Sequence, residues 1–164
     1  MEADGPDRID EIAIAARVRD LFVNRGMTLA LAESCTGGLI ASTLTSVPGA
    51  SGYFHSSVVS YSPDAKQRFL GLDPDLPEGI VSAECARAMA EGALRATGAD
   101  IALATTGNSG PEAMEGKPVG LVFAAVATKN KTFALRLKLK GNRNEIRQAA
   151  TASALELLIR EVGR

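Results

Sequence analysis

The sequence predicts an α/β fold, with a three-layer α/β/α arrangement around a mixed, mainly parallel sheet of about five strands. Three observations lead to this prediction. Short apolar runs alternate along the chain with segments of helical periodicity. Glycine, proline or a helix-capping side chain stands at most of the boundaries between them. Hydrophobic residues make up 46% of the 164 residues and aromatic residues only 4%, so small aliphatic side chains must fill the core.

The first third of the chain is predicted to contain a helix, a strand and a second helix. From Asp7 onward, apolar residues recur at i, i+4, i+7 and i+8, the spacing of an amphipathic helix, which Gly26 then ends as a C-cap. Residues 28–32 have the composition of a short buried strand. Residues 39–46 return to a helical pattern, which the Pro48-Gly49 pair ends. The apolar residues of the first helix are Ile14, Val18, Leu21 and Phe22.

A strand and two helices are predicted in the middle of the chain. The strand is rich in β-branched side chains. Ser62 is typical of a helix N-cap and Pro63 of a first helical position, so a helix begins there. A loop with two prolines separates it from the next helix, which Ser82 caps and Gly98 closes. These elements are the strand over residues 57–61 and the helices over residues 63–70 and 82–97.

The last third is predicted to add three strands and a final helix. An apolar strand over residues 100–105 leads into a glycine-rich segment, residues 106–116. Two further strands, joined by a tight polar turn at residues 129–131, form the expected antiparallel hairpin. Asn142 caps the final helix. The two hairpin strands cover residues 119–128 and 132–139.

Length and charge limit the classes of protein to which the chain can belong. Its 164 residues suit one domain over residues 1–164, with residues 1–6 as a frayed tail. The formal net charge of −1 argues against broad binding to nucleic acid or to an anionic membrane. The acidic start does not resemble a signal peptide, and no apolar run approaches the roughly 20 residues that span a bilayer. We therefore expect a cytoplasmic protein with neither a nucleic-acid nor a membrane partner.

Few residues are available for metal or thiol chemistry. The two cysteines, Cys35 and Cys85, are too few for a disulfide framework and have no metal-ligand spacing. The single histidine, His55, leaves no pair of histidines for a metal, and its surroundings give no support for a Ser-His-Asp triad. No metal and no cofactor are therefore predicted. Cys35 is either a nucleophile at a helix N-terminus or a small packing residue.

Polar residues and glycines stand at three predicted strand ends, where ligands gather in open α/β sheets. The first such segment is residues 32–38, Ala-Glu-Ser-Cys-Thr-Gly-Gly. Ser34 lies just before a helix, so its hydroxyl would lie near free backbone amides that stabilise an oxyanion or bind phosphate. Alternatively, a hydroxyl here only caps the helix and the glycines permit a tight turn. The amides in question belong to Thr36, Gly37 and Gly38.

The second segment follows the strand predicted over residues 57–61. Tyr61 and Lys66 lie five residues apart across a strand-to-helix junction, so both can face one cleft. A lysine that is partly desolvated near other positive groups can lose its proton and act as a base toward a serine. The alternative is a surface lysine whose stem alone packs, beside a half-buried core tyrosine.

The third segment is the glycine-rich stretch that begins at Thr106. It is not a Walker A loop, because Gly116-Lys117 is followed by Pro118. It either supplies backbone donors and small hydroxyls to a ligand or is a long connection. Arg143 and Arg147, at i and i+4 of the final helix, either clamp a phosphate or form a solvated face. The candidate ligand residues of the loop are Thr106, Gly107, Asn108, Ser109 and Gly110.

Taken together, these segments resemble one family closely, that of the CinA C-terminal domain, which includes stand-alone nicotinamide-nucleotide amidohydrolases. The resemblance runs from the first predicted helix to the end of the chain, and its most specific stretch is Ala-Glu-Ser-Cys-Thr-Gly-Gly at residues 32–38. The other matching stretches are Pro48-Gly49-Ala50-Ser51, Val59-Ser60-Tyr61-Ser62, Ala65-Lys66, Thr106-Gly107, Gly110-Pro111, Lys117-Pro118-Val119-Gly120, Gly141-Asn142-Arg143 and Glu145-Ile146-Arg147.

The resemblance implies hydrolysis of the carboxamide of nicotinamide mononucleotide to nicotinate mononucleotide and ammonia. By position, Ser34 is then the nucleophile, Lys66 its base, and Tyr61 a proton-relaying or orienting partner. The amides after the serine would hold the oxyanion, while the two arginines and the loop at residues 106–110 would bind the phosphate and ribose. The family also suggests a homodimer.

The glycine-rich loop departs from the family pattern. Asn108 and Ser109 stand where the family has small apolar residues, and later glycines of the family are missing. This departure leaves an alternative open: a non-catalytic module, linked to a competence or damage response, that binds a nucleotide or phosphate without turnover.

Overall fold

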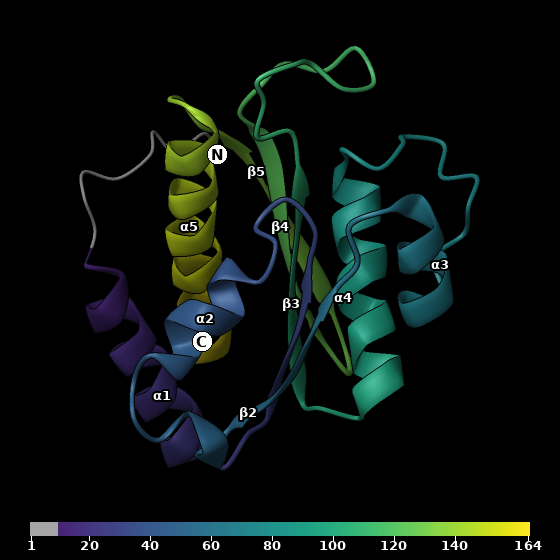
Figure 1. Cartoon of the computed structure of the whole chain (residues 1–164). Helices are drawn as coiled ribbons and strands as arrows, with labels where there is room; N and C mark the ends of the chain where they lie inside the picture. Colours follow the sequence, from purple (N-terminus) through teal and green to yellow (C-terminus); the bar gives the residue numbers. More distant parts are fainter. Residues whose placement is uncertain (1–9) are drawn as a thin grey trace.

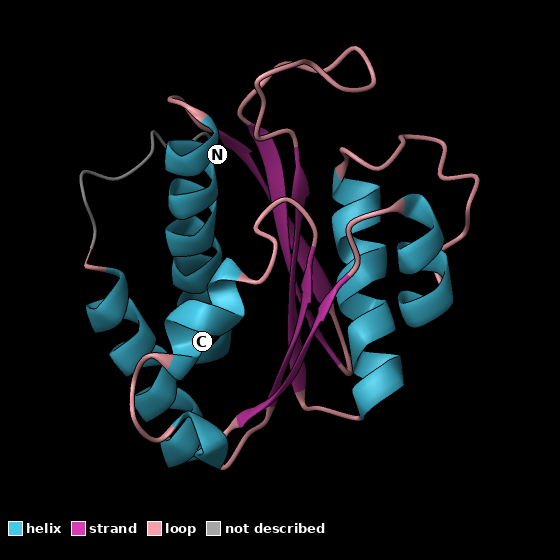
Figure 2. Cartoon of the chain, in the orientation of Figure 1, coloured by secondary structure: helices cyan, strands magenta, loops and turns pink. Residues whose placement is uncertain are grey.

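A five-stranded mixed sheet separates two layers of helices in the computed structural model, which describes residues 10–164 (Figure 1). The strand order is β2-β1-β3-β4-β5. Helices α1, α2 and α5 cover one face of the sheet, and α3 and α4 cover the other (Figure 2). The strands are β1 (Leu29–Glu33), β2 (Phe54–Val59), β3 (Ile101–Gly107), β4 (Leu121–Thr128) and β5 (Thr132–Lys138). The helices are α1 (Glu11–Arg25), α2 (Leu39–Thr45), α3 (Pro63–Leu70), α4 (Ala83–Thr97) and α5 (Arg143–Gly163), with a short 3-10 turn η1 (Ala50–Gly52).

The three-layer α/β/α prediction with a mixed sheet is confirmed, and the strand directions divide evenly. β1 pairs in parallel with β2 and with β3, whereas β3–β4 and β4–β5 are antiparallel. The sequence predicted a mainly parallel sheet. The difference arises because no helix lies between β3 and β4, so the chain returns along the neighbouring strand in the opposite direction.

Small side chains let the helices approach the α4 side of the sheet closely. Alternate residues of the central strands on this side are alanines, and α4 faces them with Ala86, Ala90 and Ala93. Gly92 allows α3 and α4 to cross, since a Cβ there would lie 2.2 Å from the carbonyl oxygen of Leu70. The opposite side is filled by larger aliphatic residues of β1, α1 and α5. Each fully buried leucine or isoleucine contributes about 1.5–3 kcal/mol, so the core holds the strand ends in fixed positions.

Most predicted boundaries agree with the structure to within two residues, and the starts of β2 and α1 differ by more. The predicted span of β2, residues 57–61, lies too late, because the chain leaves the sheet after Val59 and Ser62 already caps α3. The helix predicted from Asp7 begins at Glu11, with Asp10 as its N-cap. Residues 1–6, predicted to be a frayed tail, lie outside the described residues, as do residues 7–9. The η1 turn had no counterpart in the prediction.

Candidate active site

The turn between β1 and α2 lies at the carboxyl ends of the three parallel strands. The Ser34 amide donates to the carbonyl of Thr105, the β3 residue that pairs with Glu33 (3.0 Å), and the Ser60 amide donates to the carbonyl of Glu33 (2.9 Å). These bonds tie the turn to both neighbouring strands. Because β1 is buried throughout and β3 nearly so, the position of the Ser34 backbone is set by the sheet.

A buried carboxylate that the sequence analysis did not single out holds the turn from beneath. The side chain of Glu33 is fully buried and accepts five hydrogen bonds from the turn, from the start of α2 and from β2. A carboxylate at a helix N-terminus is stabilised by the free amides and by the helix dipole. An acidic residue directly after an apolar strand was the available signal. The donors are the Thr36 and Ser57 hydroxyls and the amides of Gly38, Ile40 and Ala41.

The prediction that the amides of Gly37 and Gly38 are free for an oxyanion is wrong. The Gly37 amide donates to the Ser34 carbonyl (3.0 Å), and the Gly38 amide donates to the Glu33 carboxylate (3.1 Å). Both glycines have positive φ angles, 58° and 96°, so their role is to let the chain turn.

Two other amides of the turn have no acceptor. Within residues 10–164, the backbone N–H groups of Cys35 and Thr36 donate to no other residue, and the Cys35 N–H has only its own thiol beside it. Backbone donors directly after a serine hydroxyl are the usual components of an oxyanion hole. Of the three amides predicted to stabilise an oxyanion, only that of Thr36 is therefore available. The Cys35 amide, which was not predicted, is available as well.

The amine of Lys66 lies against the hydroxyl of Ser34. Its Nζ is 2.8 Å from Ser34 Oγ, 2.8 Å from the carbonyl oxygen of Ser60 and 3.1 Å from that of Tyr61. Carbonyl oxygens can only accept hydrogen bonds, whereas a hydroxyl both donates and accepts. As an ammonium, the Lys66 amine donates to all three oxygens; as a neutral amine, it can keep its two N–H groups on the carbonyls and accept the Ser34 hydroxyl proton with its lone pair.

Burial favours the neutral form of this amine. The Lys66 side chain is 1% exposed, and no carboxylate among the described residues pairs with it. Burial lowers the pKa of the Lys66 amine below its ordinary value, although two neighbouring thiols oppose the shift. Burial also raises the pKa of the Cys35 thiol to about 12 and that of the Cys85 thiol to about 11, so both stay protonated at neutral pH. Cys35 therefore packs in the core rather than acting as a nucleophile.

Tyr61 contacts Lys66 through its backbone and Arg143 through its side chain. The phenol ring is 56% exposed, and its oxygen accepts a hydrogen bond from Arg143 Nη2 at 2.7 Å. Within the described residues, no hydrogen bond joins the phenol to Ser34 or Lys66. The Tyr61 carbonyl thus helps to orient the Lys66 amine. In the described residues, the Tyr61 phenol has no hydrogen bond that would let it pass a proton between Ser34 and Lys66.

The two predicted arginines lie at different depths. Arg143 is exposed and bridges the Tyr61 hydroxyl and the carbonyl of Gly110, at the rim of the site. Arg147 is half-buried and donates to the carbonyls of Cys35 (3.3 Å) and Thr36 (3.0 Å) in the turn. In the described part of the chain neither guanidinium has a carboxylate partner, so Arg147 leaves positive charge at the turn that carries Ser34 and Arg143 leaves it beside Tyr61.

The loop after β3 is held largely by its own polar groups. The Asn108 side chain is buried; it accepts from the Gly110 amide (3.1 Å) and donates to the Lys117 carbonyl (3.3 Å). The Thr106 hydroxyl donates to the Ile80 carbonyl (2.7 Å). A Cβ at Gly107 would lie 2.7 Å from the Cα of Val122, so close strand packing requires this glycine. Three of the predicted ligand residues therefore have structural contacts.

Ser109 differs from its neighbours in the loop. Within the described residues, neither its amide nor its hydroxyl has a hydrogen-bond partner, although the residue is only 5% exposed. The adjacent Gly110 has a φ of 81° and presents its carbonyl to Arg143. Of the predicted loop residues, Ser109 is thus the one whose polar groups are left for a ligand, since both the amide and the carbonyl of Gly110 have partners.

A clasp formed by Glu115 and Lys117 fastens the far part of the loop. The Glu115 carboxylate accepts hydrogen bonds from the amides of Ile80 (2.9 Å) and Val81 (3.0 Å), and Lys117 Nζ lies 3.3 Å from it. Partial burial raises the pKa of the Glu115 carboxyl, but these hydrogen bonds outweigh it, so the pKa lies below its ordinary value. The clasp keeps the loop in place beside the segment that precedes α4.

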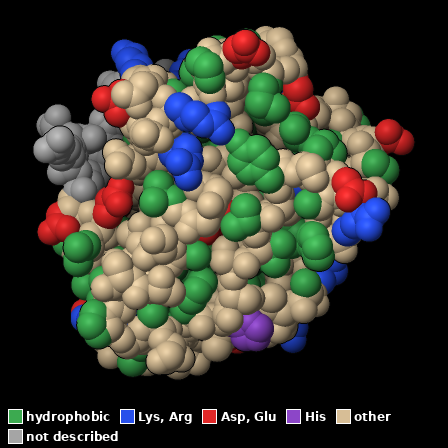
Figure 3. Space-filling view, viewed as in Figure 1, with side chains coloured by type: hydrophobic (Ala, Val, Ile, Leu, Met, Phe, Trp, Pro, Cys, Tyr) green, Lys and Arg blue, Asp and Glu red, His purple; other side chains and the backbone are tan. Residues whose placement is uncertain are grey.

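Surface features support the location of the site at this end of the sheet. Figure 3 shows lysine or arginine side chains next to hydrophobic ones on the upper part of the face seen in Figure 1. The exposed hydrophobic residues of this end include Val59, Tyr61, Met114 and Val119. No group of three potential metal ligands occurs in the part of the chain that the structure describes, and no helix in that part is long and apolar enough to cross a membrane.

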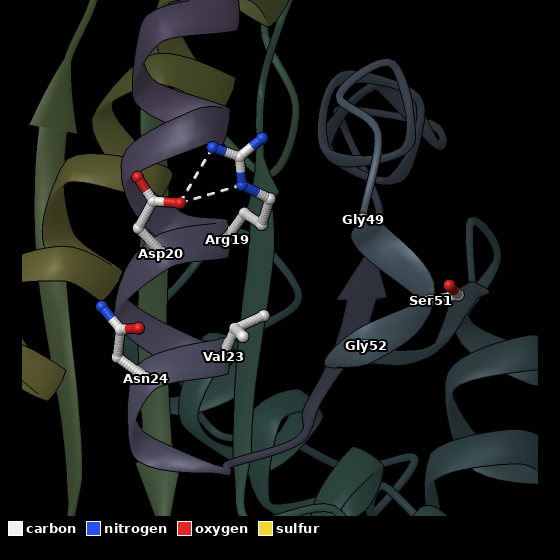
Figure 4. A pocket seen from close by; sticks show the side chains of 7 residues that line it. All are labelled: Arg19, Asp20, Val23, Asn24, Gly49, Ser51 and Gly52. Carbon is white, nitrogen blue, oxygen red and sulfur yellow. Dashed lines mark hydrogen bonds and ion pairs between the residues drawn. The ribbon is translucent and has the colours of Figure 1, made fainter.

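A cavity of about 350 Å³ lies elsewhere, between α1 and the segment that contains η1 (Figure 4). Arg19 and Asp20 at its rim form an ion pair of 2.9 Å with each other. The cavity therefore offers no unpaired charge that would select a ligand, and it contains neither Ser34 nor Lys66.

Comparisons with known proteins identify the family and agree with the fold. The family model described as the CinA C-terminal domain matches residues 11–162. A CinA-like protein of Geobacter metallireducens is 47% identical over 93% of the chain, which spans 38% of that protein. The chain thus spans little more than a third of the length of such relatives. The crystal structure of competence/damage inducible protein CihA from Agrobacterium tumefaciens matches with a TM-score of 0.90 and 36% identity, over 97% of this chain and 99% of that one. The competence damage-inducible protein A (ComA) from Klebsiella pneumoniae matches with a TM-score of 0.89 and 31% identity, over 95% and 99% of the two chains.

Proposed function

The chain belongs to the CinA C-terminal domain family, and from this premise we propose that it is an amidohydrolase that converts nicotinamide mononucleotide to nicotinate mononucleotide and ammonia. The observation that carries the proposal is the 2.8 Å contact between Lys66 Nζ and Ser34 Oγ, two side chains that are both buried. A site that only bound a nucleotide would gain nothing from a buried amine directed at a serine hydroxyl.

The first half of the reaction forms an acyl-enzyme. Neutral Lys66 takes the hydroxyl proton of Ser34 as its Oγ attacks the carboxamide carbon of the substrate. The carbonyl oxygen becomes an oxyanion within reach of the free amides of Cys35 and Thr36. The Lys66 ammonium then returns the proton to the leaving nitrogen. The C–N bond breaks, ammonia departs, and the nicotinate group remains as an ester on Ser34.

The second half of the reaction releases the product. A water molecule attacks the ester carbon and gives one proton to the neutral Lys66 amine. The tetrahedral intermediate collapses, Lys66 returns the proton to Ser34 Oγ, and nicotinate mononucleotide leaves. In both halves of the reaction, the two backbone carbonyls that accept hydrogen bonds from Lys66 Nζ keep the lone pair of the neutral amine directed at Ser34 Oγ.

The rim of the site suggests where the rest of the substrate lies. Arg143 is exposed, has no carboxylate partner among the described residues, and suits the substrate phosphate. The unpartnered amide and hydroxyl of Ser109 suit ribose hydroxyls. Since the Asn108 side chain holds the loop, the departure from the family pattern at this position need not remove a ligand group. A homodimer and a cytoplasmic location remain predictions.

Ammonia release from nicotinamide mononucleotide tests the proposal. We expect the purified protein to release ammonia and nicotinate mononucleotide in equal amounts, measured by a coupled ammonia assay and by chromatography. The exposed serine of α2 provides a matched control, and the Ser42→Ala variant should retain the wild-type rate. Saturable binding of the nucleotide without any ammonia would instead support the non-catalytic binding module.

A further inference from the structure

The guanidinium of Arg147 is bound to the turn that carries Ser34. It reaches from the second turn of α5, where Nε donates to the Cys35 carbonyl (3.3 Å) and Nη2 to the Thr36 carbonyl (3.0 Å). The approach is close, because a Cβ at Gly37 would lie 3.4 Å from Nη2. Within residues 10–164 no carboxylate neutralises this charge. The contact therefore places a full positive charge on two peptide groups of the turn.

Peptide planarity connects this contact to the free amides. The carbonyl of Cys35 and the N–H of Thr36 belong to one peptide unit, whose C=O and N–H point in opposite directions in the trans form. A guanidinium on the carbonyl side therefore directs the Thr36 N–H away from Arg147. It also draws electron density toward the carbonyl oxygen, which makes the N–H a stronger donor, as in a chain of hydrogen bonds that polarise one another.

The preceding peptide unit is fixed in the same way by a different group. The Ser34 carbonyl accepts from the Gly37 amide (3.0 Å), so the Cys35 N–H, in the same peptide plane, is also held on the opposite side. Each of these two amides is thus oriented by a hydrogen bond to the carbonyl of the same peptide unit, which belongs to the preceding residue. Only for the Thr36 amide does a charged side chain make that bond.

We propose that Arg147 is a positioning residue that orients and polarises the Cys35–Thr36 peptide so that the Thr36 N–H stabilises the oxyanion formed on attack by Ser34. The inference rests on the proposed function for its substrate, but the geometry concerns any acyl or phosphoryl group that Ser34 attacks. It replaces the phosphate clamp expected from the i, i+4 pair of arginines. In that pair, only Arg143 is left at the exposed rim.

Kinetics with nicotinamide mononucleotide distinguish the two roles. We expect Arg147→Met to lower kcat by about 10- to 100-fold, less than the loss of a whole oxyanion-hole donor, with KM changed by less than about two-fold. Arg147→Lys should recover part of kcat, because it keeps the charge but loses the two-pronged contact. Arg87→Met, an exposed arginine of α4, is the matched control and should be unchanged. A phosphate clamp would raise KM and leave kcat unaltered, and that result would overturn the proposal.

A small fluorophosphonate probe tests the positioning role without the nucleotide. Its phosphoryl oxygen occupies the oxyanion position when Ser34 attacks phosphorus, and fluoride leaves. We expect the labelling rate of Ser34, followed by intact-protein mass, to fall in Arg147→Met by the same factor as kcat. Unchanged labelling would overturn the proposal, as would failure of the wild type to be labelled. If the wild type releases no ammonia, but Ser34 is labelled more slowly in Arg147→Met than in the wild type, the substrate assignment fails while the role of Arg147 stands.

Discussion

Replacing Ser34 by alanine should lower kcat for nicotinamide mononucleotide by a factor on the order of 10⁴ to 10⁶, the range found when the nucleophile of a serine hydrolase is removed. The Ser34 hydroxyl is the group that the Lys66 amine contacts at 2.8 Å, and it lies beside the free amides of the turn. Without it no acyl-enzyme forms. Substrate binding should persist, because the rim residues do not depend on one hydroxyl.

Ammonia release and nucleotide affinity measure the two parts of this expectation separately. Isothermal titration of Ser34→Ala with nicotinamide mononucleotide should give an affinity close to the wild-type KM. The Ser42→Ala variant controls for loss of a serine hydroxyl in the same region. A Ser34→Ala variant that keeps more than about a tenth of the wild-type rate would mean that another group attacks the amide, and the assignment of the nucleophile would be wrong.

Replacing Lys66 by methionine should abolish turnover to a similar degree, because no other base contacts Ser34 in the described residues. In the wild type, kcat/KM should rise with pH through the pKa of Lys66, which burial lowers below the ordinary lysine value. The residual rate of Lys66→Met should lack this rise. Exposed Lys129 provides the matched control, Lys129→Met, which should keep the wild-type profile. A rising limb retained in Lys66→Met would assign the base to another group.

The same variant should change how stability depends on pH. A lysine with a lowered pKa binds fewer protons in the folded state than in the unfolded state between its folded pKa and about 10.4. The free energy of unfolding of the wild type, relative to Lys66→Met, should therefore rise as pH increases through that window and fall as pH decreases. Urea titrations at several pH values measure this difference. A flat difference would mean that the amine is not desolvated.

The fold was largely predictable because its signals are local. Ser62, Ser82 and Asn142 cap their helices as predicted, and each accepts a backbone amide three residues on. The boundaries of β2 were not predictable from composition, since its β-branched residues, Val58 and Val59, stand at its end and not at its centre. The even division of strand directions also depends on how the loop after β3 returns, which no local pattern encodes.

The sequence predicted the central pair of the candidate site, Ser34 and Lys66. It did not predict the contacts that Glu33 and Arg147 make with the turn. Ser34 and Lys66, 32 residues apart, lie in hydrogen-bond contact as the resemblance implied. The hydrogen-bond partners of the backbone amides were not predictable, because the Gly38 amide donates to the Glu33 carboxylate five residues earlier, a contact that depends on the three-dimensional shape of the turn. Likewise, i, i+4 spacing places two arginines on one face but does not reveal that Arg147 alone reaches the turn.

The most direct test of the account is the covalent state of Ser34 during turnover. The wild type is mixed with nicotinamide mononucleotide, quenched in acid within milliseconds, and digested for mass mapping, with hydroxylamine added in a parallel reaction. We expect the peptide that contains Ser34 to carry the nicotinate-mononucleotide acyl group, and hydroxylamine to divert part of the product to the hydroxamate. Steady ammonia release with that peptide unmodified and no hydroxamate would contradict attack by Ser34.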